Sequence, residues 1–384
     1  MDTSKVRIKA AAVHAAPVYM DKKATTQKVI DLIRQAKSKD ITLLVFPETF
    51  IPGYPYFIEC YPPLKQVSAI AQYAEQSVVT QGSEIVEICA ACRDSGVAIS
   101  LGVSERVAGG YTLFNSQVNI DTDGRILGIH RKLQPTYVER AVWAQGSGAT
   151  LKTYRYRDGY NMGGLCCWEN CMQLARQALA EQNEHIHAAA WPALNTMAGF
   201  EGIANSQIEA LMKSHALMCQ TFVICASNYV DETCLVWMEN NLGQQDLVKR
   251  GGGWSSIIHP FCELLAGPQT GETECLVDAE INLGELAVVK VWIDAAGHYK
   301  RPEVLGLTVD KKPLWRDDPE QAGPSTARKI PFWDEHGQAK TILLESAGGT
   351  EIKLNNFKQA QNSVSDVGNS HSDDRTSGER ESAE

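Results

Sequence analysis

The sequence predicts an α/β protein in which mixed sheets are stacked in layers with helices. Two observations lead to this class. Apolar runs of the length of a buried strand alternate along the chain with stretches whose apolar residues recur at helical spacing. Some neighbouring strands are also joined by a short turn, as antiparallel pairing allows. We therefore expect sheets with both parallel and antiparallel pairs, covered by helices.

The first elements show this alternation clearly. Residues 6–13 form a strand-like run, and residues 25–39 form a helix with Val29, Ile33 and Ala36 on one face. Residues 41–46 are continuously apolar and are followed by Pro47, as expected of a central strand.

The later elements follow the same logic. A helix is predicted from the spacing of Ile85, Ile88, Cys89 and Cys92, and Asp123-Gly124 predicts a hairpin turn. Further helices are predicted at residues 172–183 and 203–219. The remaining predicted strands are residues 97–103, 113–120, 125–131, 162–168, 186–190, 222–227, 255–258 and 274–281.

The composition changes near Leu307, which predicts two parts. Residues 1–310 form the main domain and residues 311–384 a polar C-terminal extension. Residues 341–344 are the one weakly strand-like run in the extension. The last thirty residues contain a single aromatic residue, Phe357, and cannot bury enough apolar area to offset the entropy of ordering. We expect those residues to be disordered.

Charge and composition exclude several classes of protein. The 384 residues include 36 Lys and Arg and 46 Asp and Glu, a net charge of −10, which argues against nucleic-acid binding. No apolar run reaches the length of a membrane span, and the N-terminus lacks the apolar core of a signal peptide. Small molecules are the expected partners, and the expected location is cytoplasmic.

The cysteine and histidine patterns do not predict a metal or cofactor site. Most of the eleven cysteines lie in apolar runs, where reduced thiols pack as small core residues. Cys89 and Cys92 fall on the apolar face of their helix. His185 and His187 can share one face of a strand but lack a third ligand in the sequence. Gly251–Gly253 lacks the Lys-Ser/Thr of a phosphate loop and more simply allows close backbone approach.

Three positions suggest chemistry, each with a plainer alternative. Glu48 ends a buried strand, where desolvation favours a general base, although a salt-bridged carboxylate at a sheet edge is the alternative. Lys132 ends another strand, within what is otherwise a solvated basic cluster. Cys166 and Cys167 lie at a strand-to-helix turn that can expose a nucleophile, or they are a buried thiol pair. A serine hydrolase is disfavoured because the chain has no G-x-S-x-G motif.

Taken together, these segments resemble the three catalytic motifs of the nitrilase branch of the carbon–nitrogen hydrolase superfamily. The resemblance covers about residues 6–310, and additional similar segments strengthen it. The three motifs are VFPETFIPGYPYF (45–57), HRKLQPTYVER (130–140) and GGLCCWEN (163–170). The additional segments are EHIHAAAWP (184–192), KRGGGWSSII (249–258) and DAAGHYKRPEVL (294–305).

The resemblance implies a four-layer αββα sandwich and a Glu-Lys-Cys triad. Carried onto this sequence, the triad is Glu48 as general base, Lys132 as stabiliser of the thiolate and oxyanion, and Cys167 as nucleophile. Glu139 matches a further acidic residue near the family's active site, or else it pairs with Arg140. Cys166 precedes the nucleophile position. No metal or organic cofactor is implied.

The sequence departs from the family pattern at positions that affect substrate preference. Tyr137 stands where His is frequent, Gln134 where a basic residue is frequent, and His259-Pro260-Phe261 replaces a Pro-Asp-Gly turn. Tyr54 and Trp168 are candidates for lining an apolar substrate pocket, with ordinary packing as the alternative. Arylaceto-, aromatic and aliphatic nitriles all remain open.

The expected activity is hydrolysis of a nitrile to the carboxylic acid and ammonia through thioimidate and thioester intermediates. The alternatives are a cyanide hydratase, which forms formamide from HCN, an amidase of the wider superfamily, or a non-catalytic filament-forming relative. Family members pair through helices near the nucleophile and often extend into spirals. The resemblance therefore implies a homo-oligomer built from dimers.

Overall fold

The computed structural model describes residues 5–315, 317–318, 328–333 and 339–344. The chain divides into two compact units, Met1–Ala322 and Gly323–Glu384. The predicted disorder of residues 355–384 concerns residues outside the described part. None of the described helices is both long and apolar enough to cross a membrane.

The first unit contains two sheets of six strands each in its described part. The strand order is β12-β1-β2-β3-β4-β5 in the first sheet and β11-β10-β9-β8-β7-β6 in the second. The strands of the first sheet are β1 (Arg7–His14), β2 (Leu43–Val45), β3 (Ala98–Arg106), β4 (Leu113–Ile120), β5 (Ile126–Arg131) and β12 (Cys275–Asn282). Those of the second are β6 (Tyr154–Arg155), β7 (Asn161–Cys166), β8 (Ile186–Trp191), β9 (Phe222–Ser227), β10 (Ser255–Ile258) and β11 (Leu264–Gln269).

Both sheets are mixed, as predicted. Parallel pairs join β1 to β2 and β2 to β3 in the first sheet, and β7 to β8 and β8 to β9 in the second. Antiparallel strands complete each sheet on both sides. The hairpin predicted at Asp123-Gly124 joins β4 to β5, where Gly124 has a φ of +77°.

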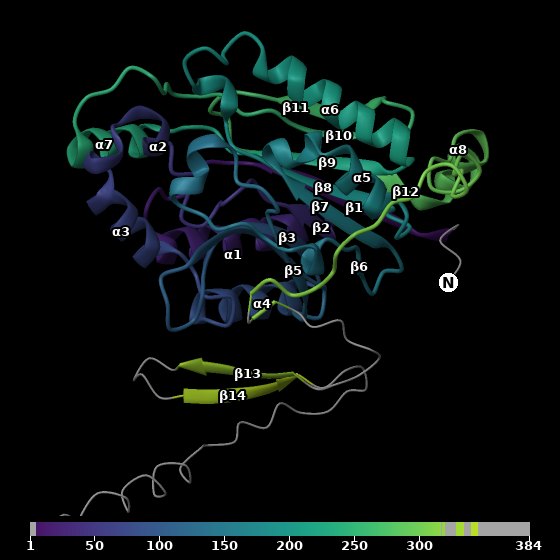
Figure 1. The fold of residues 1–384 in the computed structure, drawn as a ribbon, viewed down its shortest axis with the longest axis horizontal. Coiled ribbons are helices and arrows are strands. Elements are labelled where there is room, and N and C mark those ends of the chain that lie inside the picture. The colour runs from purple at the N-terminus through teal and green to yellow at the C-terminus, as the bar shows by residue number, and fades with distance from the viewer. Residues whose placement is uncertain (1–4, 316, 319–327, 334–338, 345–384) are drawn as a thin grey trace, which may run out of the picture. The chain divides into compact units, whose positions relative to one another are not determined.

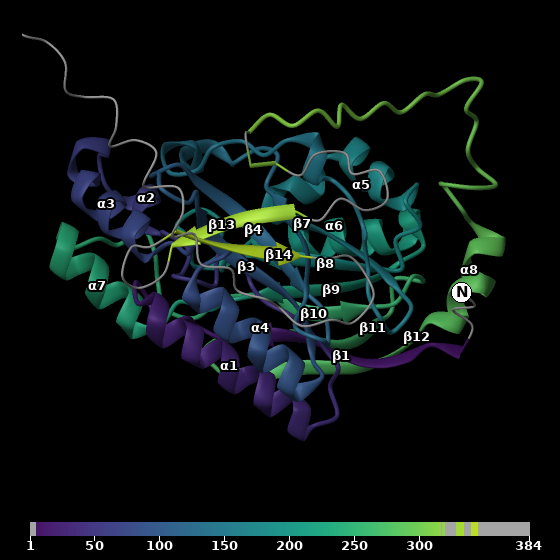
Figure 2. The same ribbon diagram turned by 90° about the horizontal axis from the view of Figure 1, so that it is seen from below.

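Four of the helices cover the outer faces of the two sheets. The helix bounds are α1 (Lys22–Ser38), α2 (Phe57–Cys60), α3 (Val67–Gln76), α4 (Ser83–Ser95), α5 (Gln173–Ala180), α6 (Ala204–Cys219), α7 (Glu232–Leu242) and α8 (Leu286–Trp292). Helices α1 and α4 pack beneath the first sheet, and α5 and α6 lie over the second (Figures 1 and 2). This is the four-layer αββα sandwich that the sequence predicts.

Alternation along the strands divides the core between the layers. Ala10 and Ala12 of β1 face the second sheet and pack with Ile186 and Ile224, whereas Ala11 and Val13 face α1 and α4. Because successive side chains point to opposite faces, a strand buried on both faces reads as a continuous apolar run. This explains why strand positions could be read from the sequence.

Several boundaries differ from the prediction. The strand expected over residues 162–168 ends at Cys166, because Cys167 has a φ of +51° and begins the short 3₁₀ helix η5 (Cys167–Cys171). The strand expected over residues 41–46 is paired only from Leu43 to Val45. Helix α1 begins at Lys22, three residues earlier than expected, because Asp21 caps it by accepting from the Ala24 N–H.

The second unit is described only through one hairpin. Strands β13 (Arg328–Trp333) and β14 (Ala339–Leu344) pair antiparallel, with Arg328 opposite Leu344. The weak strand signal at residues 341–344 falls within β14.

Candidate active site

The first predicted site residue, Glu48, lies immediately beyond the end of β2 in a buried turn. Its side chain is 1% exposed. Oε1 accepts a hydrogen bond from Lys132 Nζ at 2.8 Å and another from Asn115 Nδ2 at 2.6 Å. Oε2 has no hydrogen-bond partner among the described residues, so it is available to a group that enters the site.

The backbone around Glu48 is held close to β3. A Cβ added to Gly102 would lie 2.0 Å from the Pro47 carbonyl oxygen and 3.0 Å from the Glu48 Cα. A side chain at position 102 would therefore push the Glu48 turn away from the sheet. Glycine at this position allows Glu48 to lie directly against the strand.

Lys132 follows the last residue of β5 and is fully buried. Its ammonium donates to Glu48 Oε1 and, at 2.7 Å, to Glu139 Oε2. A buried ammonium requires such compensation, because desolvation of an unpaired charge is costly. The basic cluster expected at this strand end is thus buried and paired with carboxylates.

Glu139 lies in the short 3₁₀ helix η3 (Tyr137–Ala141) and joins the same cluster. Its Oε1 accepts from the Tyr54 hydroxyl at 3.0 Å, and its Oε2 also accepts from the Thr136 N–H at 2.7 Å. No bond to Arg140 is present in the described structure. Its carboxylate therefore faces Lys132, and the alternative pairing with Arg140 is not formed.

Cys167 begins η5 at the end of β7 and is 1% exposed. Its Sγ and carboxylate oxygens of Glu48 and Glu139 all lie within 4.8 Å of one another. The Trp168 backbone N–H hydrogen-bonds to the Cys167 thiol. The preceding Cys166 is the last residue of β7 and is not part of this set. The structure thus brings Glu48, Lys132, Glu139 and Cys167 together from three separate segments of the chain.

Burial and neighbouring charges shift the pKa values of Glu48, Lys132 and Cys167. Burial raises the pKa of Glu48 to about 7, against the opposing effect of Lys132. Burial and the nearby Glu48 raise the pKa of the Cys167 thiol above its usual range. Burial would lower the pKa of Lys132, but Glu139 and Glu48 outweigh it and raise that pKa. The resting site therefore holds a neutral thiol beside a carboxyl that titrates near neutrality.

Glu169, which the sequence did not single out, connects the turn that carries Cys167 to the end of the strand that precedes Lys132. Its carboxylate accepts from the backbone N–H of Cys166 at 2.9 Å and from that of Leu133 at 2.7 Å. His130 Nε2 donates to the same carboxylate at 3.0 Å. These bonds fix the residues adjacent to Cys167 and Lys132 relative to each other. The only sequence signal was its place directly after Cys167-Trp168.

A second buried network lies beside Cys167. Asn170 Nδ2 donates to the Cys167 carbonyl oxygen at 2.9 Å, and its Oδ1 lies 2.9 Å from His187 Nε2. His187 Nδ1 and His215 Nε2 each lie 2.9 Å from an oxygen of Glu184. Glu184, His187 and His215 could also offer three ligand atoms to a metal ion. The hydrogen bonds already engage those atoms, so the cluster is satisfied without one.

The remaining predicted residues, Tyr54 and Trp168, belong to a group of packed aromatic side chains around the cluster, which we call the aromatic wall. Tyr54 packs against Tyr56 and Trp143, with ring centroids 5.0 and 6.0 Å apart. Trp168 is partly buried and packs edge-to-face on Trp191 at 5.8 Å. Tyr137, by contrast, is 78% exposed and does not line the site.

Comparison with known proteins identifies the family to which the chain belongs. The chain matches the family model for carbon-nitrogen hydrolase over residues 9–291. The chain belongs to the carbon-nitrogen hydrolase family. Its curated relatives place this carbon-nitrogen hydrolase in the nitrilase branch.

Two of those relatives illustrate the similarity. An aliphatic nitrilase of Rhodococcus rhodochrous is 35% identical over 309 residues, covering 79% of this chain and 83% of the relative. An arylacetone-specific nitrilase of Alcaligenes faecalis is 35% identical over 320 residues, covering 82% and 89%. A carbon-nitrogen hydrolase structure from Helicobacter pylori G27 has the same fold, with a TM-score of 0.61, 19% identity and coverage of 79% and 99%.

Proposed function

We propose that this carbon-nitrogen hydrolase is a nitrilase that converts an organic nitrile and two waters into a carboxylic acid and ammonia. The observation that carries the proposal is the buried convergence of Glu48, Lys132 and Cys167. Curated nitrilases at about 35% identity over most of the chain support the same reaction.

The first step is attack by sulfur with loss of its proton to Glu48. Because the pKa of Cys167 is raised by burial, the thiol gives up its proton as the S–C bond forms. The unpartnered Glu48 Oε2 is the acceptor, and Glu48 then passes this proton to the nitrile nitrogen, which gives a thioimidate. Lys132 and the Trp168 N–H stabilise the charge that develops.

The later steps regenerate the enzyme. Glu48 removes a proton from water as the water oxygen adds to the thioimidate carbon. This proton and the hydroxyl proton of the adduct then pass to the nitrogen, so that ammonia leaves and a thioester remains. A second water cleaves the C–S bond, releasing the acid, and the proton returns to the Cys167 thiolate. Glu139 accepts a hydrogen bond from a second N–H of Lys132 throughout the reaction and keeps the ammonium charged.

The aromatic wall supports an apolar substrate. Tyr54 and Trp168 flank the cluster, and small-molecule sites are usually lined by such side chains with a few placed polar groups. The substrate class within the organic nitriles stays open, because an aliphatic and an arylacetone-specific relative are equally similar to this chain.

We also propose a domain organisation, an oligomeric state and a cellular location for the enzyme. Residues 1–310 serve as the catalytic domain and residues 311–384 as an extension. The enzyme forms homo-oligomers built from dimers, supported by apolar side chains exposed on α5 and α6. A cytoplasmic location fits the eleven cysteines, all of which are free thiols.

The test is product analysis with a panel of nitriles. Phenylacetonitrile, benzonitrile, an aliphatic dinitrile and cyanide are incubated with the wild type, Cys167→Ala and Cys166→Ala. Acid and ammonia in equal amounts from an organic nitrile, lost in Cys167→Ala and retained in Cys166→Ala, is the expected result. Formamide from cyanide alone would reassign the enzyme as a hydratase. Activity that survives Cys167→Ala but not Cys166→Ala would overturn the nucleophile assignment.

A further inference from the structure

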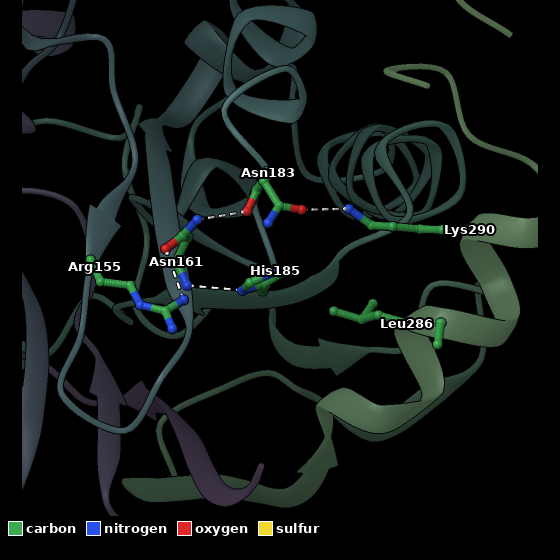
Figure 3. Close-up of a pocket in the computed structure, with 7 residues that line it drawn as sticks. Arg155, Asn161, Asn183, His185, Leu286 and Lys290 are labelled. Carbon is green, nitrogen blue, oxygen red and sulfur yellow. Dashed lines mark hydrogen bonds between the residues drawn. The ribbon is translucent and has the colours of Figure 1, made fainter. Parts of the chain in front are cut away.

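A pocket of about 590 Å³ lies apart from Cys167, between the β6–β7 edge of the second sheet and α8. Its lining residues are Arg155, Asn161, Asn183, His185, Leu286, Ala287 and Lys290 (Figure 3). This volume falls within the usual range for sites that bind small molecules. No lining residue belongs to the cluster of Glu48, Lys132, Glu139 and Cys167.

The polar groups of this pocket are predominantly cationic or hydrogen-bond donors. Arg155 and Lys290 face it from opposite sides, and no carboxylate is among the lining residues (Figure 3). Neither cation forms an ion pair with a carboxylate in the part of the chain that the structure describes. Arg155 Nη1 donates to Asn161 Oδ1 and Lys290 Nζ to Asn183 Oδ1, which are neutral acceptors. Positive charge therefore accumulates here in a chain whose net charge is −10.

His185 contributes a third donor from the pocket wall. His185 is only 4% exposed. Nδ1 accepts from the Asn161 backbone N–H at 3.0 Å, so the ring proton is on Nε2. Nε2 has no hydrogen-bond partner among the described residues. Because His185 lines the pocket and this nitrogen is not among the buried unpartnered atoms, its N–H can donate to a ligand that enters.

The electrostatics agree with a cationic site that the neighbouring carboxylates of Asp294 and Glu184 offset only in part. Burial, with Lys290 and Arg155 adding to it, lowers the pKa of His185 to about 4. Burial also lowers the pKa of Lys290, which Asp294 only partly offsets. An anion that entered the pocket would reduce both effects, because it would supply the missing opposite charge.

We propose that this pocket binds the oxyanion group, carboxylate or phosphate, of a small metabolite. The guanidinium of Arg155 offers N–H donors in a planar arrangement suited to two oxygens, and Lys290 and His185 supply the donors across the pocket. Leu286 and Ala287 form an apolar floor for a small carbon body. The site is distinct from the nitrile site and does not depend on the reaction assigned to Cys167.

The test uses the full chain and two simple probes, inorganic phosphate and acetate. Binding is measured by titration calorimetry, with chloride holding the ionic strength constant so that general screening does not contribute. We expect Arg155→Gln and Lys290→Gln each to weaken binding about tenfold or more, the effect of losing one charge-assisted hydrogen bond. Whichever probe binds more tightly identifies the preferred oxyanion.

Matched variants separate local binding from changes in net charge or folding. Arg157→Gln removes the same charge from an arginine that pairs with Asp123 outside the pocket, so oxyanion binding should be unchanged. Ala287→Glu places a carboxylate in the pocket without removing a bond, and should abolish binding while the protein stays folded. If neither probe binds the wild type, or if Arg155→Gln and Ala287→Glu bind as it does, the proposal fails. Nitrile turnover is measured separately and bears only on the proposed function.

Discussion

At the scale of single residues, Glu48 sets the expected pH dependence. It must be ionised to take a proton, and its pKa is about 7 because burial outweighs the effect of Lys132. Below that pH, kcat/KM should fall about tenfold per pH unit as the carboxyl becomes protonated, and above it this limb should level off. A pH–rate profile measures the limb directly.

Asn115 provides a sharper check of this assignment. Its amide donates to Glu48 Oε1 and lowers the pKa of that carboxyl, so Asn115→Ala should move the acid limb to higher pH. Asn119→Ala is the control, since Asn119 lies on the same strand and bonds instead to the Tyr156 hydroxyl. An acid limb that stays in place in Asn115→Ala would assign it to another group.

The sequence predicted which residues lie together in the candidate site, but not the residues that hydrogen-bond to them and to their neighbours. Glu48, Lys132 and Cys167 each stood beside a strand end in a recognisable motif. Asn115 and Glu169 act through bonds to residues 67 and 36 positions away. Such bonds exist only once the strands pack, and no local pattern encodes them.

At the scale of elements, Glu169 joins the end of β5 to the start of η5. Glu169→Gln should lower kcat by about 10²-fold with a smaller change in KM, because it replaces an acceptor with a donor and shifts Cys167 relative to Lys132. Steady-state kinetics measure the changes in kcat and KM separately. The rate of Cys167 alkylation, followed by mass spectrometry, should fall in parallel.

The control for this prediction is Glu181→Gln. Glu181 is an exposed carboxylate paired with Lys300, so its loss should leave both measurements unchanged. Normal kcat and alkylation in Glu169→Gln would show that the backbone alone holds the nucleophile turn.

Elements with a strong apolar pattern were predicted, and those with a weak one were missed. Strand β4 was predicted at its observed bounds, since all eight of its residues are buried. Strand β11 was missed because it contains Gly267 and Pro268, which normally argue against a strand. Helix α7 was missed because few of its residues, Cys234, Met238 and Leu242, are buried.

At the scale of the whole molecule, α5 and α6 present a surface suited to pairing. Leu174 is 71% exposed on α5 and Met218 51% exposed on α6, and the two helices contact each other. We expect Leu174→Lys to dissociate the oligomer toward smaller species, because a charge would be buried at the interface. Sedimentation velocity measures the change.

Leu64→Lys is the matched control, because Leu64 is 90% exposed on a different part of the surface. Its sedimentation should equal that of the wild type. If Leu174→Lys also sediments as the wild type does, pairing through this surface is wrong.

The sandwich could be predicted through the family resemblance, but the pairing of distant strands could not be read from the residues. The apolar runs indicate which segments are strands. They do not say that β12 pairs with β1, because many registers satisfy the same alternation. That choice depends on how all layers close together.

The pairing of β1 with β12 also has a consequence for synthesis of the chain. Arg7 lies opposite Asn282, so β1 leaves the ribosome long before the strand that pairs with this edge. At usual rates of translation this delay is roughly 15–50 s. Until then the free edge of β1 has no partner and is open to wrong pairing. Expression at lower temperature or with chaperones that shield nascent strands should therefore raise the yield of folded enzyme.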